Sequence, residues 1–470
     1  MCVCLCWVCL CLCRRRALKM GLFGKKSKFE PLKAGVYHTA WQKEGKSYRL
    51  HLRVDNDLSG VMIINAAKVL HLNKTAAEYA RLLIEGANEK DIVGYIKSQY
   101  RVNKSRIAGD YRKIKETVET LAEREDICPV SFLGLERIEP LKKELSAPYR
   151  IDFAMTYECN NRCLHCYVEE GRKRVSMSLD RWKEAIKKCW EIGVPHICFT
   201  GGEPTVYEHL PELVETAEDI GIVTGVLTNG RRLSDENYIS RLIGAGVDHF
   251  QITLESHNEE IHDKMVGVCG AFKETVKGIE NAVKAGVYTL TNTTLTRLNV
   301  EGIEETVKFI ADKGIKVFAM NGLIYSGKAP ESGLGIPEDK LEEIINRIMS
   351  AAEGAGMKFI WYTPTRYCQF DPIALGLGIK QCSAARYNMC VEPDGMLIPC
   401  QSYYEPLGNF LDEKWEKLWN APLCVSLRKR DWVSDECRSC ARFSECGGGC
   451  PIYAKVNKIF CMDATSAAAV

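Results

Sequence analysis

The sequence lacks a strong net charge, a membrane-length apolar run and an export signal. Its 63 Lys and Arg residues nearly balance 61 Asp and Glu residues, and a net charge of +2 creates no global field that would attract nucleic acid or an anionic membrane. The apolar run in residues 1–13 is shorter than the roughly 20 residues of a spanning helix, and its arginines follow it instead of preceding it. These absences favour a cytoplasmic protein that is not integral to a membrane.

Residues 1–35 are a Cys-rich and basic segment that we do not expect to belong to the fold. Met1–Cys13 alternates cysteine with bulky apolar residues in a spacing that matches no cluster motif. We expect translation to begin at Met20, and the alternative is a peripheral membrane tether. The low-complexity end, residues 464–470, is expected to be an unstructured tail.

Cysteine is abundant, with 23 residues in the chain. An odd number without an export signal argues against a disulfide framework, and clustered cysteines in a reducing compartment indicate metal ligands. Beyond the N-terminal segment, they gather near residue 160 and between residues 368 and 461.

Residues 36–125 predict a small module of strands followed by three helices. Tyr48–Val54 alternates as a strand should, and two further strands, Gly60–Ile64 and Lys68–Leu72, predict a hairpin. The predicted helices are Thr75–Glu85, Asn88–Tyr100 and Asn103–Arg124. A hairpin on three short helices is typical of a winged helix, and residues 126–148, punctuated by prolines, predict a linker.

Residues 149–365 alternate between strand and helix patterns. Such repeated units predict an α/β fold with a parallel sheet, either doubly wound or curled into a barrel, whose chemistry lies beyond the carboxyl ends of the strands. The predicted strands are Arg150–Met155, His196–Thr200, Val223–Thr228, His249–Leu254, Thr289–Thr294 and Lys316–Asn321. After about residue 365, Cys and Gly replace this rhythm, which predicts a region that is cross-linked by metals.

Three cysteines, Cys159, Cys163 and Cys166, follow the first strand in a C-x3-C-x2-C spacing. Thiolates so spaced can bind three irons of a cubane cluster and leave the fourth iron open to a substrate. The alternative is a zinc knuckle, but three ligands do not close a tetrahedral zinc site.

This motif resembles that of the radical S-adenosylmethionine (SAM) superfamily. His165 stands where the family has a residue near the adenine. The segment Gly201-Gly202-Glu203-Pro204 after the second strand is similar to the family's GGEP motif, which receives the methionine amino group. Thr228 and Asn229 end the third strand, and Glu255 and Ser256 end the fourth, at places where the family contacts the cosubstrate. One departure is Val266, which replaces an arginine found in many relatives.

The resemblance implies a partial (β/α)6 TIM-like barrel and a radical mechanism. One electron from a [4Fe–4S] cluster cleaves S-adenosylmethionine, and the resulting deoxyadenosyl radical abstracts hydrogen from a substrate. The protein supplies orientation and a dry cavity. We expect Cys166, Glu203, Asn229 and Ser256 to face one cavity.

The C-terminal cysteines resemble the SPASM extension of radical SAM enzymes, which binds two auxiliary [4Fe–4S] clusters. By this resemblance, the first cluster is held by Cys368, Cys382, Cys400 and Cys450, and the second by Cys437, Cys440, Cys446 and Cys461. Cys390 is the alternative to Cys368, and a zinc ribbon of Cys437, Cys440, Cys446 and Cys450 is the alternative to the second cluster. The remaining cysteines match no ligand position and are expected to be free thiols; they are Cys128, Cys189, Cys198, Cys269 and Cys424.

Residues 36–125 resemble the PqqD-like recognition element of enzymes that modify ribosomal peptides. The hairpin edge at Lys68–Leu72 could accept a leader peptide as an added strand, with Ile107 and Tyr111 lining apolar pockets. The alternatives are a winged helix that only caps the barrel or one that binds nucleic acid, which the balanced charge disfavours.

The sequence therefore predicts a radical SAM oxidoreductase that modifies a ribosomally made peptide, with three [4Fe–4S] clusters, S-adenosylmethionine and a low-potential electron donor such as ferredoxin or flavodoxin. The first alternative is an enzyme of cofactor or tetrapyrrole biosynthesis. The second is a non-catalytic iron–sulfur electron carrier or peptide-binding adaptor. No catalytic acid or base can be named from the sequence.

Overall fold

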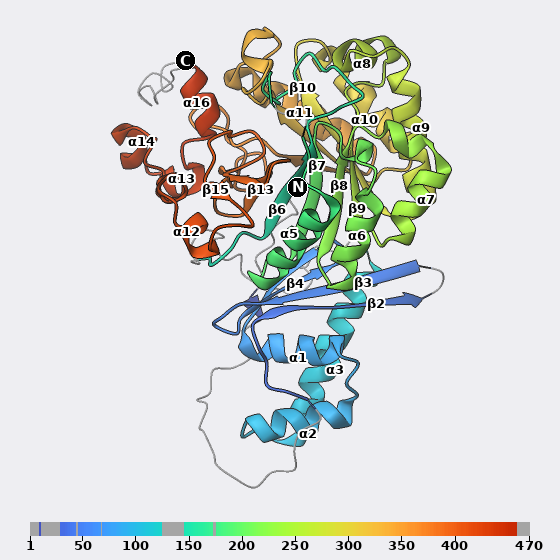
Figure 1. Cartoon of the computed structure of the whole chain (residues 1–470), viewed down its shortest axis with the longest axis vertical. Coiled ribbons are helices and arrows are strands. Elements are labelled where there is room, and N and C mark those ends of the chain that lie inside the picture. The colour runs from blue at the N-terminus through green and yellow to red at the C-terminus, as the bar shows by residue number, and fades with distance from the viewer. Residues whose placement is uncertain are drawn as a thin grey trace.

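A computed structural model describes residues 9–10, 29–43, 46–66, 68–124, 145–172 and 175–457. The described chain forms two sheets, one of five strands and one of ten. Figure 1 shows the smaller sheet, in blue, lying between the larger sheet and helices α1 to α3. No helix in these ranges combines the length and the apolar character needed to cross a membrane.

The N-terminal module, residues 35–124, has an antiparallel sheet with three helices on one face. Its strands are β2 (Gly35–Lys43), β3 (Lys46–Val54), β4 (Gly60–Ile64) and β5 (Lys68–Leu72). Its helices are α1 (Lys74–Ile84), α2 (Glu89–Gln99) and α3 (Lys104–Glu123). The predicted strands and helices are all present, while β2 was not predicted. A short strand, β1 (Cys9–Leu10), pairs in parallel with the outer edge of β5.

Asparagine side chains fix where the three helices of the module begin. Asn73, Asn88 and Asn103 each precede a helix and accept a hydrogen bond from the backbone N–H three residues later, at 2.9, 3.0 and 2.8 Å. Such a cap satisfies one of the otherwise unpaired N–H groups of the first turn.

The alternating side chains of β3 separate into two buried faces. Leu50 and Leu52 point into the core of the module, where they pack with its helices. His51 and Arg53 are 1% and 2% exposed and point the other way, towards the base of the large sheet. The sheet of the module is therefore covered on both sides.

Polar contacts attach the module to the base of the large sheet. Arg49 Nε lies 2.7 Å from Asp248 Oδ1, and Arg49 also pairs with Glu218. His51 Nδ1 lies 2.9 Å from the carbonyl oxygen of Gly221, and Arg53 donates to the carbonyl oxygen of Pro148 at 3.2 Å.

An apolar cluster accompanies these contacts, with Val61, Ile63 and Val69 of the module packing against Val223 at the start of β8 (Val223–Thr228). The burial of Asp248 alone would raise the pKa of this carboxyl group. His51 and Arg49 outweigh burial, so the pKa lies below its usual value.

Asp248→Asn is expected to lower the free energy of unfolding by about 3 kcal/mol, because removing one partner of a buried ion pair leaves the other charge uncompensated. Chemical denaturation measures this loss, and hydrogen exchange in β3 should rise with it. The matched control is Asp412→Asn, whose side chain is 60% exposed and pairs with Arg181 on the surface. This control should change the free energy of unfolding by no more than about 0.5 kcal/mol. Equal losses in both variants would contradict a docking role for Asp248.

The large sheet contains the parallel strands that the sequence predicts, together with β12, which it does not. Its strands, in spatial order, are β12, β11, β10, β9, β8, β7, β6, β13, β14 and β15, so the sheet is an open, partial barrel. The parallel strands of the barrel, besides β8, are β6 (Arg150–Thr156), β7 (His196–Gly201), β9 (His249–Thr253), β10 (Tyr288–Leu295), β11 (Val317–Gly322) and β12 (Lys358–Trp361), and β13 of the C-terminal region joins them in parallel beside β6.

Amphipathic helices cover the outer face of this barrel (Figure 1). They are α5 (Leu179–Glu191), α6 (Leu210–Asp219), α7 (Glu236–Gly244), α8 (Glu259–Val266), α9 (Ala271–Lys284), α10 (Ile303–Asp312) and α11 (Leu341–Gly354). Outward strand residues such as Phe153, Phe199 and Phe250 are fully buried in the core beneath them. The inward positions between them are largely polar, which leaves the barrel interior suited to a polar ligand.

The C-terminal region joins the barrel through its sheet. β13 (Asn388–Val391) pairs in parallel with β6, and β14 (Met396–Ile398) and β15 (Gly408–Asn409) extend the sheet in antiparallel fashion. Five short helices complete the part of this region that the structure describes, up to residue 457: α12 (Trp415–Trp419), α13 (Pro422–Lys429), α14 (Asp435–Ser439), α15 (Phe443–Cys446) and α16 (Pro451–Asn457).

Candidate active site

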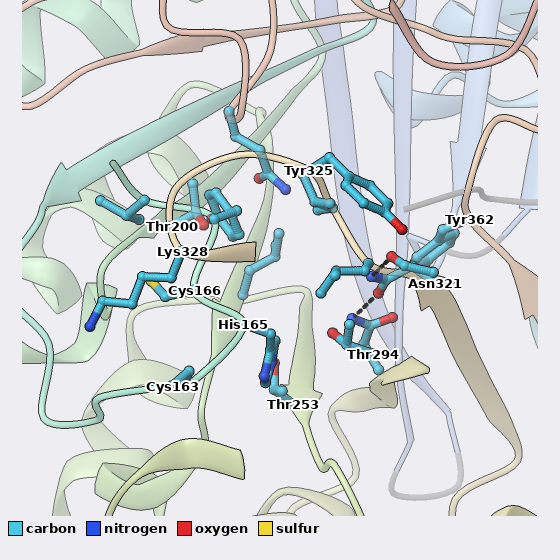
Figure 2. Close-up of a pocket in the computed structure, with 18 of the residues that line it drawn as sticks. Cys163, His165, Cys166, Thr200, Thr253, Thr294, Asn321, Tyr325, Lys328 and Tyr362 are labelled. Carbon is cyan, nitrogen blue, oxygen red and sulfur yellow. Dashed lines mark hydrogen bonds between the residues drawn. The ribbon is translucent and has the colours of Figure 1, made fainter. Parts of the chain in front are cut away.

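A cavity of about 920 Å³ lies at the carboxyl ends of the barrel strands. The loop after β6 lies on one side of it, with His165 and Cys166, and residues of β10, β11 and the segment after β12 lie opposite (Figure 2). Cys450 and Tyr453 of the C-terminal region also line this cavity. The barrel and the Cys-rich region therefore share one site.

The three cysteines of the C-x3-C-x2-C motif, Cys159, Cys163 and Cys166, all line the cavity. Their loop is held by backbone bonds to the end of α8, from Arg162 N to Val266 O at 2.8 Å and from Leu164 N to Met265 O at 2.9 Å. Val266, which replaces the arginine of many relatives, thus contributes its backbone to this support.

The thiols of this loop are protonated when no metal is bound. Burial raises the pKa of Cys163 well above its usual value, and the charge of Glu255 raises it further. Burial also raises the pKa of Cys166. Thiolates form when a metal displaces these protons, so cluster binding is expected to release protons. Three soft sulfur ligands on one loop fit an iron–sulfur cluster.

Gly201 and Gly202 bring the loop after β7 directly against the cysteine loop. A Cβ atom at Gly201 would collide with the carbonyl oxygen of Thr156, and one at Gly202 with that of Glu158. Gly202 N instead donates to Thr156 O at 2.7 Å. Only glycine permits this close approach of the two backbones.

Glu203 follows the two glycines and links the ends of β7 and β8. It is 1% exposed and lines the cavity. Its carboxylate accepts hydrogen bonds from Thr205 Oγ1 at 2.7 Å, Thr228 Oγ1 at 2.6 Å and Asn229 N at 2.7 Å. Burial raises the pKa of Glu203, although these hydrogen bonds oppose the shift. Thr228 and Asn229 also line the cavity.

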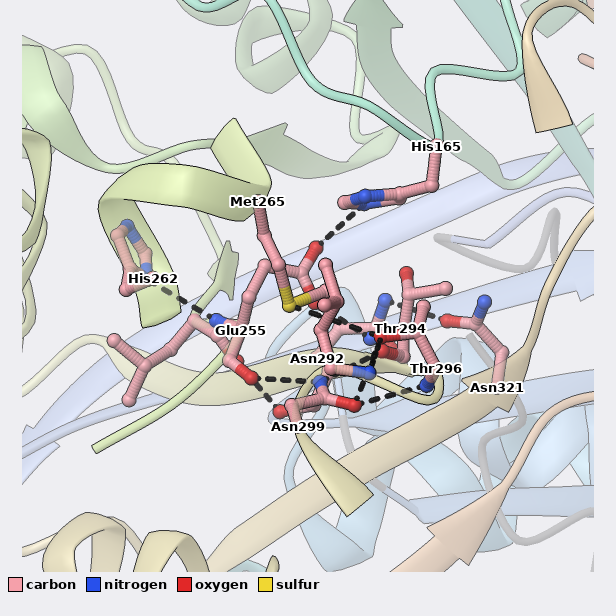
Figure 3. A network of polar contacts seen from close by, with 12 residues as sticks. His165, Glu255, His262, Met265, Asn292, Thr294, Thr296, Asn299 and Asn321 are labelled. Carbon is pink, nitrogen blue, oxygen red and sulfur yellow. Dashed lines mark hydrogen bonds and ion pairs between the residues drawn. The ribbon is translucent and has the colours of Figure 1, made fainter. Parts of the chain in front are cut away.

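His165 and Glu255 form a second polar pair, shown in Figure 3. His165 Nε2 lies 2.9 Å from Glu255 Oε1, and the other carboxylate oxygen accepts from Thr294 N at 2.9 Å. Burial alone would lower the pKa of His165, but the Glu255 charge and hydrogen bond raise it overall. His165 is thus oriented by Glu255, a partner that the resemblance did not indicate.

Ser256 does not line the cavity in the described part of the chain, although it was expected to face it. The residue is 1% exposed, and its Oγ accepts a hydrogen bond from Asn258 N at 3.1 Å. Glu255, the residue before it, still lines the cavity, so the lining on this side stops one residue before Ser256. Cys166, Glu203 and Asn229 do line one cavity, as expected.

Amide and phenol groups line the cavity at positions that the sequence interpretation missed. Asn292 Nδ2 donates to Asn321 Oδ1 at 2.8 Å, and Tyr362 Oη donates to Gln251 Oε1 at 3.2 Å. The sequence did carry a signal for Asn292, Asn321 and Gln251, because they are polar side chains within parallel strands. Such strands are normally apolar on both faces, so a polar residue at an inward position indicates a site.

The C-terminal cysteines fall into two neighbourhoods. The pKa of Cys400 is raised by burial and then by the nearby Cys382 and Cys450. The pKa of Cys446 is raised by burial, and the charges of Cys368 and Cys437 add to this shift.

These neighbourhoods keep Cys382, Cys400 and Cys450 together, as the resemblance implies. They place Cys368 beside the other set, since Tyr367 N, next to it in the chain, donates to Cys446 Sγ at 3.4 Å. The alternative eighth ligand, Cys390, is fully buried in β13, and the charge of Cys400 acts on its thiol. Cys128 and Cys461 lie outside the described residues.

Two family models match the chain. Residues 153–310 match the radical SAM superfamily, and residues 382–441 match SPASM, an iron–sulfur cluster-binding domain. The chain is a radical SAM enzyme with a SPASM domain, whose cofactors are S-adenosylmethionine and [4Fe–4S] clusters. A non-catalytic electron carrier is thereby excluded.

Individual proteins resemble larger parts of the chain. The PqqA peptide cyclase of Granulibacter bethesdensis is 27% identical over 307 residues, which cover 63% of this chain and 80% of the cyclase. The structure of Streptococcus suis SuiB bound to S-adenosylmethionine has a TM-score of 0.64 at 17% identity, covering 88% of this chain and 98% of SuiB. The structure of anSMEcpe with S-adenosylmethionine and a peptide has a TM-score of 0.53 at 19% identity, covering 66% and 95%.

Proposed function

We propose that this enzyme oxidatively modifies a ribosomally made peptide after recruiting it through a leader segment. The observation that carries the proposal is the shared cavity. Its volume of about 920 Å³ lies near the upper end of small-molecule pockets, about 300–1,000 Å³. It thus has room for S-adenosylmethionine and for one or two peptide side chains. Two relatives support this proposal. One is a PqqA peptide cyclase, and the other, SuiB, has been solved bound to the precursor peptide SuiA.

Three [4Fe–4S] clusters form part of the proposal. Cys159, Cys163 and Cys166 would hold the first. Cys437, Cys440, Cys446 and Cys461 would hold one auxiliary cluster. Cys382, Cys400 and Cys450 would hold the other, with Cys368 or Cys390 as its fourth ligand. When bound, the first cluster and S-adenosylmethionine supply the carbon radical that abstracts hydrogen.

The chain's own residues orient the cosubstrate in this proposal. Gly201 and Gly202 let the backbone approach it, and Glu203 faces its amino group while it fixes Thr228 and Asn229. His165, held by Glu255, lines the same cavity. We place no contact at Ser256, which lies away from the cavity.

After the hydrogen atom has left, the substrate radical must release one electron and one proton to form a thioether, a carbon–carbon cross-link or a decarboxylated residue, whereas an epimer forms when the radical takes a hydrogen atom back. The auxiliary clusters would receive that electron, since four thiolates leave no open iron for substrate. A low-potential donor such as ferredoxin or flavodoxin would supply the electron for the initial cleavage.

Leader recognition is proposed at the outer edge of β5, where an added strand would pair with the backbone. In the structure, β1 of the same chain pairs with this edge at His71 and Leu72, and a leader strand would take the place of β1 there. The expectation that Ile107 and Tyr111 line open pockets was wrong, because Ile107 is fully buried and Tyr111 is 8% exposed in the core of the module. Specificity would come from other side chains.

Coexpression with short peptides encoded beside the enzyme's gene tests the proposed function. A peptide whose mass or fragmentation changes only when the enzyme is active would support it, whether the product is a thioether, a carbon–carbon cross-link, a decarboxylated residue or an epimer. A small cofactor precursor, such as a tetrapyrrole, consumed in place of every peptide would favour the alternative.

Glu203→Gln is expected to weaken S-adenosylmethionine binding about tenfold, which corresponds to about 1.4 kcal/mol. The amide would present N–H donors to the hydroxyl and N–H groups that the carboxylate now accepts from. Equilibrium binding measures the loss, and the iron content should not change. The control is Glu212→Gln, a half-exposed glutamate of α6 that pairs with His209 just before the helix. Unchanged binding in Glu203→Gln would remove this residue from the cosubstrate site.

A further inference from the structure

Three potential metal ligands meet inside the base of the barrel, away from the cysteine motifs. They are His196 and Cys198 on β7 and His249 at the start of β9. Their ligand atoms all lie within 4.8 Å of one another. They are 6%, 0% and 1% exposed, so the cluster is enclosed by protein.

Strand register brings these side chains to one place. His196 and Cys198 stand two residues apart and therefore point to the same side of β7. Cys198 pairs with Gly225 on β8, and Gly225 pairs with His249 on β9. The three strands thus place Cys198 and His249 at the same level, one on each side of Gly225.

Gly225 is what allows the imidazole of His249 to reach towards β7. A Cβ atom at this position would collide with the Cε1 and Nε2 atoms of His249. The ring therefore lies over the bare backbone of β8, and its ring centroid is 5.2 Å from that of His196.

The imidazole of His249 makes no hydrogen bond of normal geometry in this enclosed position. Both of its ring nitrogens are buried and have no such bond within the described residues, although the backbone of Thr224 lies close enough to act on the pKa of the ring. Buried polar groups are normally satisfied, because an unsatisfied one costs about 1–3 kcal/mol. The unsatisfied nitrogens therefore indicate a missing partner.

The distances within the cluster fit a tetrahedral zinc ion. Cys198 Sγ lies 3.4 Å from His196 Nε2. Around zinc, with bonds of about 2.3 Å to sulfur and about 2.0 Å to nitrogen, such a pair is separated by about 3.5 Å. We propose that His196, Cys198 and His249 bind one zinc ion that ties β7 to β9 across β8.

The surroundings suit a cation. Zinc with one thiolate would carry a net charge of +1, which is costly to bury unless it is balanced. Asp248 adjoins His249, and Asp248 and Glu218 together face the single guanidinium of Arg49. Arg150 is a second cation close to the three ligands, and it pairs with Asp152 at 2.9 Å. Asp248, Glu218 and Asp152 thus face two guanidinium groups and leave one negative charge near the cluster. A water molecule can take the fourth position, or Asp152 can, since it faces Cys198 across the β6–β7 register.

Metal analysis of the full-length enzyme with its clusters intact tests this proposal. Protein from zinc-supplemented cells should hold about one zinc per chain in addition to iron. X-ray absorption at the zinc edge should show nitrogen neighbours at about 2.0 Å and one sulfur at about 2.3 Å. Absence of zinc, or a shell of four sulfurs that places zinc in the C-terminal cysteines, would overturn the proposal.

Variants of the enzyme give a second measurement. His249→Gln and Cys198→Ser should each lower zinc at least tenfold while iron stays constant. The matched control is Cys189→Ser, since Cys189 is also fully buried but lies on α5, and its zinc should not change. Retention of zinc in His249→Gln would also overturn the proposal. If that variant fails to fold, the zinc-edge absorption spectrum of the unaltered enzyme still shows whether zinc is bound by nitrogen and one sulfur.

Discussion

Replacing Cys159, Cys163 and Cys166 together by alanine should abolish 5′-deoxyadenosine formation and remove about one third of the iron. Three cubane clusters contain about twelve iron atoms, of which the first cluster holds about four. These cysteines line the cavity, so no other described thiolate set is placed to replace them next to Glu203. Iron analysis after anaerobic reconstitution and chromatography of the nucleoside products measure both effects.

Cys424→Ala serves as the control for this experiment. Cys424 is fully buried on α13 and matches no ligand position, so its replacement should leave iron and deoxyadenosine unchanged. An unaltered enzyme with only about four irons and tightly held zinc would contradict the two auxiliary clusters. Deoxyadenosine formation by the triple variant would contradict the placement of the first cluster.

A precursor peptide without its leader should be modified about 100-fold more slowly than the intact precursor. A leader bound at β5 keeps the remaining peptide at a millimolar effective concentration near the barrel, and tethering of this kind raises apparent affinity by about 10² to 10⁴. The ratio of kcat/KM for the two peptides measures the effect. Free leader peptide should inhibit the intact precursor, because it competes for the same edge. Equal rates for both peptides would contradict leader recruitment.

The position of β1 allows a direct test of the edge itself. Because β1 pairs with β5 where the leader is proposed to bind, a chain that starts at Met20 should bind the leader more tightly than the full chain. Fluorescence anisotropy with a labelled leader peptide compares the two proteins. Equal affinities would place the leader elsewhere on the enzyme.

Local patterns predicted most of the fold. The helices of the module and the first six barrel strands were evident because periodicity and Asn caps act within a few residues. Strand β12 was missed because four residues, Lys358–Trp361, carry little pattern. Strand β13 was hidden among the cysteines, and only its pairing with β6 reveals it.

Contacts between distant segments could not be predicted in the same way. Arg49, His51 and Arg53 alternate with apolar residues and so have the pattern of a solvent-facing side of a strand, but they are covered by the base of the barrel. Periodicity reports which residues share a face and not what covers that face.

In the candidate site, too, residues within local motifs were predicted and contacts between distant segments were not. The motif residues Glu203 and Asn229 were identified by their resemblance to motifs of the radical SAM superfamily, and their place after strands agrees with the way parallel sheets gather their ligands. The partnership of His165 with Glu255 joins residues 90 positions apart, and the proximity of Cys368 to Cys446 depends on how an irregular region folds. Neither follows from spacing along the chain.

The pairing of β6 with β13 also constrains how the protein folds. Arg150 pairs with Asn388, so the first barrel strand acquires this neighbour only after nearly the whole chain has been synthesised. Until then one edge of β6 is bare, and bare edges of apolar strands promote aggregation. In a barrel expressed without the C-terminal region, that edge of β6 would stay unpaired permanently. The two regions therefore form one folding unit, and a soluble, active fragment that ends before β13 is not expected.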